Sequence, residues 1–151
     1  MRLLCAIFVV ALLTPVATLA APPLPVEKIV IDSRGGPRTF TVEIAADDAS
    51  RTTGLMHRTR LAPGAGMLFD FKSPIMAAFW MKDTPLPLDM LFVRADGSIS
   101  TVAANAVPYS TAEIMSAEPV RVVIEINSGL AKKLGITPGC KVHAAEFTRG
   151  Y

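Results

Sequence analysis

The segment from residue 120 to 126 is the most strand-like run in the sequence, and it most limits what the chain can fold into. It reads Val-Arg-Val-Val-Ile-Glu-Ile, and β-branched residues fill five of its seven positions. Its even-numbered residues are all apolar, so we expect them to face the core of a sheet. Arg121, Val123 and Glu125 then point to the opposite face.

Other short segments have the same character and are separated by turn signals. Residues 38–46 alternate cleanly, with Phe40, Val42 and Ile44 on one face. Asp96-Gly97 is a strong hairpin signal. The strands predicted in this way are 27–32, 38–46, 67–71, 75–81, 88–94, 98–103, 120–126 and 141–147.

Two short helices are predicted between these strands. One covers residues 49–56 and follows Asp47-Asp48, which supplies N-cap chemistry. The other covers residues 129–134, with Asn127-Ser128 as its cap and Gly135 in the left-handed position at its end. Many short strands with two small helices indicate a mainly β protein, a compact antiparallel barrel or sandwich.

The N-terminus has the pattern of a secretory signal peptide. A positive residue, Arg2, precedes an unbroken apolar run from Leu3 to Leu13, and small residues stand at the −3 and −1 positions of a cleavage site after Ala20. We therefore predict a signal peptide at 1–20, a leader and first strand at 21–37 and a single β-rich domain at 38–151. The apolar run is shorter than the roughly 20 residues that span a bilayer. We predict a periplasmic or secreted protein with no stable membrane span after cleavage.

Charge and cysteine content restrict the partners. Without Arg2 the mature chain has 14 basic and 13 acidic residues, a net charge of +1. This balance, with no run of basic residues, predicts no binding to nucleic acid. Only Cys140 remains after cleavage, so no intrachain disulfide is expected and the fold must depend on its hydrophobic core.

The corner from Phe79 to Asp89 concentrates polar and aromatic side chains. Trp80 and Lys82 share one face of it, and an indole beside an ammonium and carboxylates is typical of a ligand site. The alternative is that Trp80 plugs one end of the barrel. Asp83 belongs to the turn itself, because aspartate side chains bond to nearby backbone.

Two carboxylates stand within predicted strands. Asp89 shares a face with apolar neighbours and must find a hydrogen-bonding partner or a cation, because unpaired burial is unfavourable. It either caps backbone N–H groups of the preceding corner or lines a cleft. Glu125 either pairs with a neighbouring strand or faces a pocket.

The sequence holds few signs of catalytic or metal chemistry. It contains no nucleophile-elbow pattern, zinc-protease histidine pair, phosphate loop or Cys-x-x-Cys motif. Several methionines suggest copper, since thioethers bind Cu(I), but no Met-x-Met spacing supports it and methionine is a common core residue. These are Met56, Met67, Met76, Met81 and Met90. No cofactor is predicted.

An ordered set of motifs resembles a known family. The motifs are Gly54-Leu55-Met56-x-Arg58, Gly66-Met67-Leu68-Phe69, Phe79-Trp80-Met81-Lys82-x-Thr84, Pro87-Leu88-Asp89 and Glu125-x-Asn127-x-Gly129. Together they resemble the bacterial and archaeal domain of unknown function numbered 192, over roughly residues 41–147. The resemblance implies a compact β-rich domain, often exported, and no established activity. Asp83 stands where the family usually has Asn, and Cys140 where it usually has Asp.

Three functional hypotheses follow from these residues. The leading one is a non-catalytic, exported module that binds a small molecule or an envelope component. Its predicted ligand-binding residues are Arg58, Trp80, Lys82, Asp83, Asp89 and Glu125. The second is a hydrolase or lyase that uses Asp89 and Glu125 as acid and base, and the third is a structural or envelope assembly factor.

The signal-peptide prediction can be tested directly. Expressed with its full N-terminus in a bacterial host, the protein should be recovered from the periplasm with Ala21 as its first residue, because signal peptidase cuts after small residues. Mass spectrometry of the purified chain measures this. Replacing Ala20 with arginine should block cleavage, and uncut wild-type protein in the cytoplasm would contradict the prediction.

Overall fold

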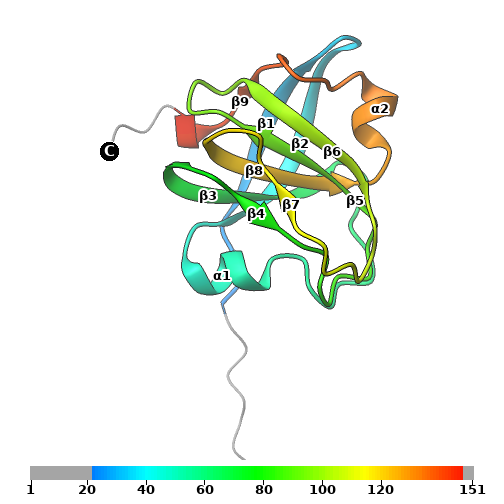
Figure 1. Ribbon diagram of the computed structural model, residues 1–151. Coiled ribbons are helices and arrows are strands. Elements are labelled where there is room, and N and C mark those ends of the chain that lie inside the picture. Colours follow the sequence, from blue (N-terminus) through cyan, green and yellow to red (C-terminus); the bar gives the residue numbers. More distant parts are fainter. Residues whose placement is uncertain (1–21, 148–151) are drawn as a thin grey trace, which may run out of the picture.

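The computed structural model describes residues 22–147, and it confirms a mainly β fold with two short helices (Figure 1). The predicted signal peptide at 1–20 lies outside the described residues. None of the helices in the described part is long and apolar enough to cross a membrane. The strands are β1 (Val26–Ser33), β2 (Gly36–Ala45), β3 (Ala65–Ile75), β4 (Ala78–Phe79), β5 (Leu88–Val93), β6 (Ile99–Ala106), β7 (Ile114–Met115), β8 (Val120–Asn127) and β9 (Val142–His143).

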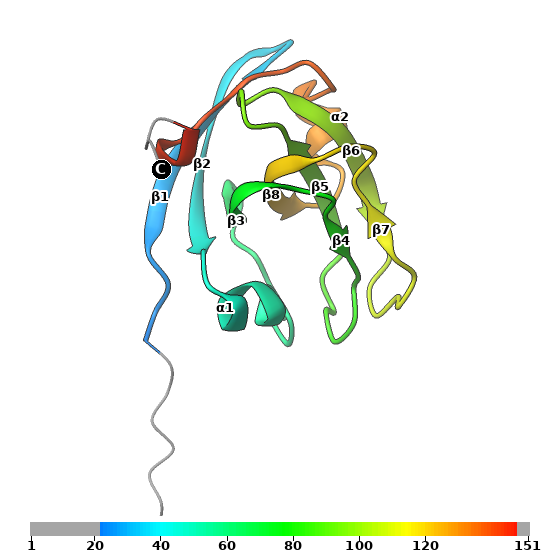
Figure 2. The same ribbon diagram turned by 60° about the vertical axis from the view of Figure 1, so that its left-hand side comes forward.

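Seven of the strands form one curled sheet, in the order β6-β5-β8-β3-β2-β1-β9. The sheet curls until its two edges approach each other, and Ser98 and Lys141 form an isolated bridge there. Backbone bonds continue this contact, since Ile99 N–H donates to Cys140 O at 2.8 Å and Val142 N–H to Gly97 O at 2.8 Å. The result is a half-barrel whose edges meet at one end (Figure 2).

One pairing differs from the antiparallel arrangement that we predicted. Strands β2 and β3 are parallel, and α1 (Asp48–Thr53) lies in the connection between them. Parallel neighbours require a crossover of a dozen or more residues, and the connection 46–64 is long enough to provide it. Strand pairing between distant segments cannot be read from alternation alone, which is why the sequence did not reveal this unit.

Some element boundaries also differ. The predicted strand at 67–71 is part of a longer strand, β3, which continues to Ile75 with an irregularity between Asp70 and Ile75. Of the predicted strand at 75–81, only Ala78–Phe79 forms a separate strand, β4. The chain then leaves the sheet, and β4 pairs with β7, a short strand within a stretch that we expected to be irregular. The predicted last strand is only β9, followed by a 3-10 helix at Ala145–Phe147.

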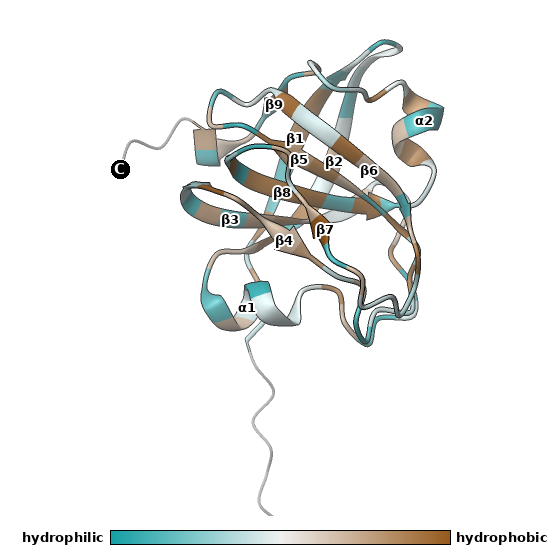
Figure 3. Ribbon diagram, in the orientation of Figure 1, coloured by the Kyte–Doolittle hydropathy of each residue, from teal (hydrophilic) through white to brown (hydrophobic). Residues whose placement is uncertain are grey.

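Apolar side chains fill both faces of the central strands, which are brown along most of their length in Figure 3. The inner face of the half-barrel holds one cluster, which includes Phe40, Leu91 and Ile124. The outer face of β3, β8 and β5 holds a second, which includes Phe69 and Phe92. The pair β4–β7 lies over this outer face in Figure 1, so the second cluster is covered as well.

Asp89 connects the sheet to α2 (Leu130–Leu134). Its side chain is fully buried and faces the inner cluster, because it pairs with Ile126 across the strands. Its Oδ2 accepts from Ala131 N–H in the first turn of α2 at 2.9 Å, and its Oδ1 accepts from Asn105 N–H at 2.9 Å. The backbone-capping alternative is therefore confirmed, although the capped groups are distant in sequence and do not belong to the preceding corner.

The predicted cap of this helix by Asn127-Ser128 is wrong. The cap position is Gly129, with no side-chain hydrogen bond. The Asn127 amide instead donates to Leu61 O at 3.1 Å. The end of the helix matches the prediction, since Gly135 has a φ of 71°.

Replacing Asp89 with alanine should destabilise the protein by about 3 kcal/mol, because the buried N–H group of Ala131 and the partly buried one of Asn105 lose their acceptor. Urea unfolding measures this. An Asp32→Ala variant removes an exposed carboxylate from β1 and should change the free energy of unfolding by less than about 0.5 kcal/mol. A similarly small loss for Asp89→Ala would contradict its structural role.

Candidate functional site

The corner at residues 80–84 is held in place by backbone hydrogen bonds to two other segments. Met81 N–H donates to Ser110 O at 2.9 Å, and His57 N–H donates to Asp83 O at 2.7 Å. Asp83 itself has a φ of 53°, a conformation that asparagine and aspartate adopt more readily than other residues. Among the described residues its side chain makes no hydrogen bond, so the predicted side-chain bond to nearby backbone is wrong and its contribution to the turn comes from its backbone.

Trp80 lies at the surface and does not plug the barrel. Its side chain is 48% exposed, and Lys82 Nζ lies 5.5 Å from the centroid of its ring. Met81 is fully buried, and Phe79 is partly buried against the outer cluster. This exposed indole lines the mouth of a cavity.

A cavity of about 390 Å³ opens on the outer face of the sheet, between α1, β3, β4 and β8. Its walls combine apolar and aromatic side chains with a few polar ones, the composition of small-molecule sites. The lining residues are Asp48, Arg51, Thr52, Thr53, Gly54, Leu55, Met56, Phe69, Phe71, Ala78, Phe79, Trp80, Thr84 and Glu125.

Glu125 supplies the carboxyl group of this cavity. It lies on the central strand β8 between two fully buried methionines, Met67 on β3 and Met90 on β5. The residue is only 4% exposed, and within residues 22–147 no hydrogen bond or ion pair engages its carboxyl group. Burial therefore raises the pKa of Glu125 to about 8, because the apolar surroundings disfavour the charged form.

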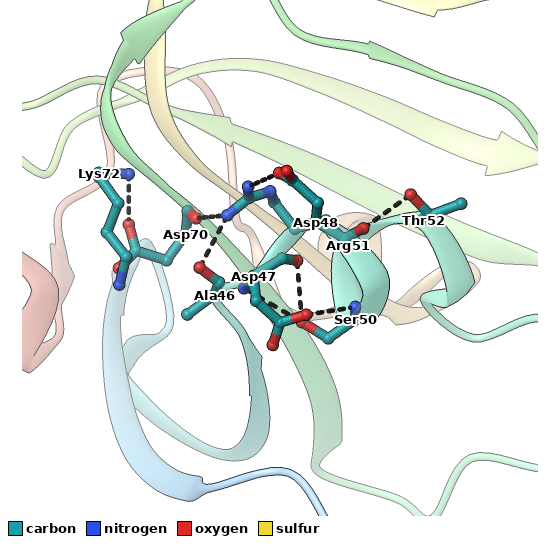
Figure 4. Close-up of polar contacts among 8 residues, drawn as sticks. All are labelled: Ala46, Asp47, Asp48, Ser50, Arg51, Thr52, Asp70 and Lys72. Atoms are coloured by element: carbon teal, nitrogen blue, oxygen red, sulfur yellow. Dashed lines mark hydrogen bonds and ion pairs between the residues drawn. The ribbon is translucent and has the colours of Figure 1, made fainter. Parts of the chain in front are cut away.

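Arg51 attaches α1 to the sheet and so forms one wall of the cavity (Figure 4). Its Nη1 donates to Ala46 O at 2.9 Å and to Asp70 O on β3 at 2.8 Å. Its other nitrogen pairs with Asp48, one turn earlier in the helix. The helix begins as predicted, with the Asp47 side chain accepting from Ser50 N–H at 2.8 Å in a capping box.

Gly54 ends α1 and allows a close approach to β3. It has a φ of 48°, and a Cβ at this position would lie 3.1 Å from the Phe69 ring. The aromatic wall continues from there, with the rings of Phe69 and Phe79 in edge contact at 5.0 Å and those of Phe71 and Phe79 at 6.3 Å.

The predicted site residues separate into two groups. Trp80 and Glu125 line the same cavity, and Lys82 packs on Trp80. Arg58 does not line it, because both of its terminal nitrogens pair with Glu43 on β2. Asp83 and Asp89 lie outside the lining as well.

Asp89 and Glu125 are not a catalytic pair. Asp89 pairs with Ile126 and Met90 with Glu125, so the two carboxylates point to opposite faces of the sheet. Asp89 faces the inner cluster and Glu125 the outer cavity. An acid–base pair needs both groups on the same side, which the structure does not provide.

Within the described part of the chain, no group of three or more His, Cys, Asp or Glu side chains is placed to hold a metal ion. Three of the methionines considered for copper are core residues with no exposure, namely Met67, Met81 and Met90. Of the other two, Met56 lines the cavity and Met76 is exposed. The five thioethers therefore do not form one cluster.

Sequence reasoning missed most of the cavity wall. Arg51, Phe71 and the threonines of α1 carry no distinctive pattern in the sequence. The motifs of the family resemblance were the available signal, because Gly54-Leu55-Met56, Phe69, Phe79-Trp80 and Glu125 all line this one cavity.

The fold and the cavity define a small half-barrel β domain with a cavity on the outer face of its sheet. The chain belongs to the DUF192 family, described as "Uncharacterized ACR", which matches residues 29–144. A search of curated proteins finds no match.

Two solved structures are similar to this chain. One is a protein from Sinorhizobium meliloti described as a candidate transcription regulator, with 44% sequence identity, a TM-score of 0.81 and coverage of 84% of this chain and 99% of that one. The other is a protein of unknown function from Novosphingobium aromaticivorans, with 40% identity, a TM-score of 0.78 and coverage of 87% and 99%.

The buried carboxyl group of Glu125 should make stability fall with rising pH. Its pKa is about 8 in the folded protein against an ordinary 4.5, so its stabilising contribution is complete below pH 4.5 and is lost as the pH rises through about 8. A Glu125→Gln variant keeps the shape without the ionisation. Relative to wild type, its free energy of unfolding should increase by up to about 1.4 kcal/mol per pH unit between pH 4.5 and about 8.

Urea unfolding of both proteins at pH 5, 7 and 9 measures the effect. A Glu113→Gln variant changes an exposed residue and should follow the wild type at every pH. If the difference between Glu125→Gln and wild type is the same at pH 5 and pH 9, the pKa of Glu125 is not raised in the folded protein.

Proposed function

We propose that this protein is a small-molecule-binding module and that the cavity between α1 and β4 is its site. The observation that carries the proposal is the Glu125 carboxyl group, which lines an aromatic cavity without a partner among the described residues. Buried polar groups in proteins are normally hydrogen-bonded, so an unpartnered one beside an open cavity supports a missing ligand.

The size and walls of the cavity agree with a small organic ligand. Its volume of about 390 Å³ lies in the lower part of the range for small-molecule sites. Aromatic rings from β3 and β4 supply apolar contact, while Thr84 and the threonines of α1 add hydroxyl groups. A binding role is favoured over acid–base hydrolysis because Asp89 and Glu125 point apart.

We further propose that the module works outside the cytoplasm, in the periplasm or after secretion. The support is the signal-peptide pattern of residues 1–20. The role named for the Sinorhizobium meliloti protein is not carried over to this chain. A mature net charge of +1 offers little attraction to the phosphate backbone of nucleic acid.

An envelope assembly role is the second candidate, and exposed apolar side chains around the β4–β7 pair favour it. Met76, Trp80 and Met115 are each about half exposed there. Exposed apolar groups that gather on one surface are typical of protein contacts. If this role holds, alanine at Met76 and Met115 impairs the partner contact and leaves small-molecule binding unchanged.

The binding proposal is tested by a fragment screen read through Trp80, the one tryptophan of the chain. Ligands in the cavity should change its fluorescence. An Ala78→Phe variant places a ring at the exposed cavity wall on β4, where an aromatic residue suits the strand, and should abolish this binding while the protein stays folded.

The control is Val107→Phe, which adds a ring at an exposed position outside the cavity lining. It should bind fragments as the wild type does. If no fragment binds, or if binding persists in Ala78→Phe, the cavity is not the ligand site.

A further inference from the structure

We infer that the ligand of this cavity carries a positively charged ammonium group, which the Glu125 carboxylate and the surrounding aromatic rings recognise. The inference rests on the proposed function, because it names the chemical class that the same site would take. It is argued from the unpartnered carboxyl group, the aromatic rings that line the same cavity and the charges of the lining.

The carboxyl group needs a hydrogen-bond donor. Its neighbours across the strands are Met67 and Met90, whose side chains donate no hydrogen bond. An ammonium group offers up to three donors together with a full positive charge, and it converts the costly ionised form of Glu125 into a paired one. An anionic ligand would add a second negative charge to the same enclosed space.

Four aromatic side chains line the cavity. Phe69, Phe71, Phe79 and Trp80 all contribute. The negative face of an aromatic ring attracts a cation within about 6 Å, which is how ammonium ligands are held in aromatic cages. Two of these rings already hold cations, since the Arg51 guanidinium lies 5.9 Å from the Phe71 centroid and Lys82 Nζ lies 5.5 Å from that of Trp80.

The other charges of the cavity do not replace the ligand cation. Besides Glu125, the charged lining residues are Asp48 and Arg51, and these two pair with each other. Arg51 is further engaged by the carbonyl oxygens of Ala46 and Asp70. Arg121, on the same strand as Glu125, pairs with Asp70. After these pairings, the carboxyl group of Glu125 is the one ionisable group of the described lining that lacks a partner.

A neutral ligand is the alternative to an ammonium ligand, and the two classes differ in how their affinity depends on the protonation of Glu125. Burial raises the pKa of Glu125 to about 8, so at pH 6.5 the empty site holds a proton. An ammonium ligand must expel that proton, and its affinity should rise with pH up to about 8. A neutral ligand with a carbonyl or ether oxygen would accept a hydrogen bond from the protonated group, and its affinity should fall above pH 8.

The test uses matched probes that share a carbon skeleton. They are 2-phenylethylammonium, cyclohexylammonium and butylammonium, each with the alcohol and the carboxylate of similar shape. Binding at pH 7.5 is followed by Trp80 fluorescence, and Ala78→Phe identifies the signals that come from the cavity. We expect each ammonium ion that binds to do so at least tenfold more tightly than its alcohol, and the carboxylates not to bind.

A Glu125→Gln variant isolates the charge and keeps the side-chain shape. It should weaken ammonium binding at least tenfold and change alcohol binding less than twofold. Calorimetry at pH 6.5 in two buffers of different ionisation enthalpy should show close to one proton released per ammonium bound by the wild type, and none by the variant.

The outcomes separate the two proposals. If alcohols or carboxylates bind as tightly as the ammonium ions at a position sensitive to Ala78→Phe, the ammonium inference is overturned and the binding function stands. The same conclusion follows if Glu125→Gln binds the ammonium ions as the wild type does. If no probe of any class and no fragment of the wider screen binds in the cavity, the proposed function fails and the inference with it.

Discussion

Burial of the central strand β8 on both of its faces is the constraint on which the rest of the structure depends. Val122, Ile124 and Ile126 fill the inside of the half-barrel, while Val123 packs on the outside with β3 and β5. A strand covered on both sides must be apolar at nearly every position. Glu125 is therefore conspicuous, because it places a carboxyl group where its neighbours on β3 and β5 are methionines.

The cavity lies beside α1, a helix that packs no buried side chain against the sheet. The helix has six residues, and none of them is buried. It is attached through hydrogen bonds of Arg51 to Ala46 and Asp70, so polar links replace the apolar contact that would normally seal a helix onto a sheet. The space between them is closed by rings from β3 and β4 and remains accessible to a small molecule. The parallel β2–β3 crossover thus produces both the unexpected topology and the site.

Local patterns in the sequence predicted much of this fold, but contacts between segments far apart in the sequence were not predicted. Alternation placed Phe40, Val42 and Ile44 correctly in the inner cluster, and cap chemistry at Asp47 and Gly135 gave the start of α1 and the end of α2. The parallel pairing of β2 and β3 was not predicted, because it joins segments on either side of a long connection. The groups that Asp89 caps were not identified for the same reason, since Ala131 is 42 residues away in the sequence. For Glu125, alternation gave the face correctly, but only the folded chain shows that α1 and β4 enclose that face.

A glutamate at position 125 lowers the stability of the fold, so stability does not explain its presence there. Holding a proton on this carboxyl group at pH 7, where an exposed glutamate with a pKa of 4.5 is ionised, costs about 3 kcal/mol. A methionine would fill the same space without this loss, as Met67 and Met90 do on either side. That loss is a substantial fraction of the 5–15 kcal/mol by which small domains are typically stable. A ligand that pairs with the carboxylate would offset it, so occupancy of the cavity and stability of the sheet are thermodynamically linked. Because β8 is paired with both β3 and β5, ionisation of Glu125 changes the stability of the strand that joins these two parts of the sheet.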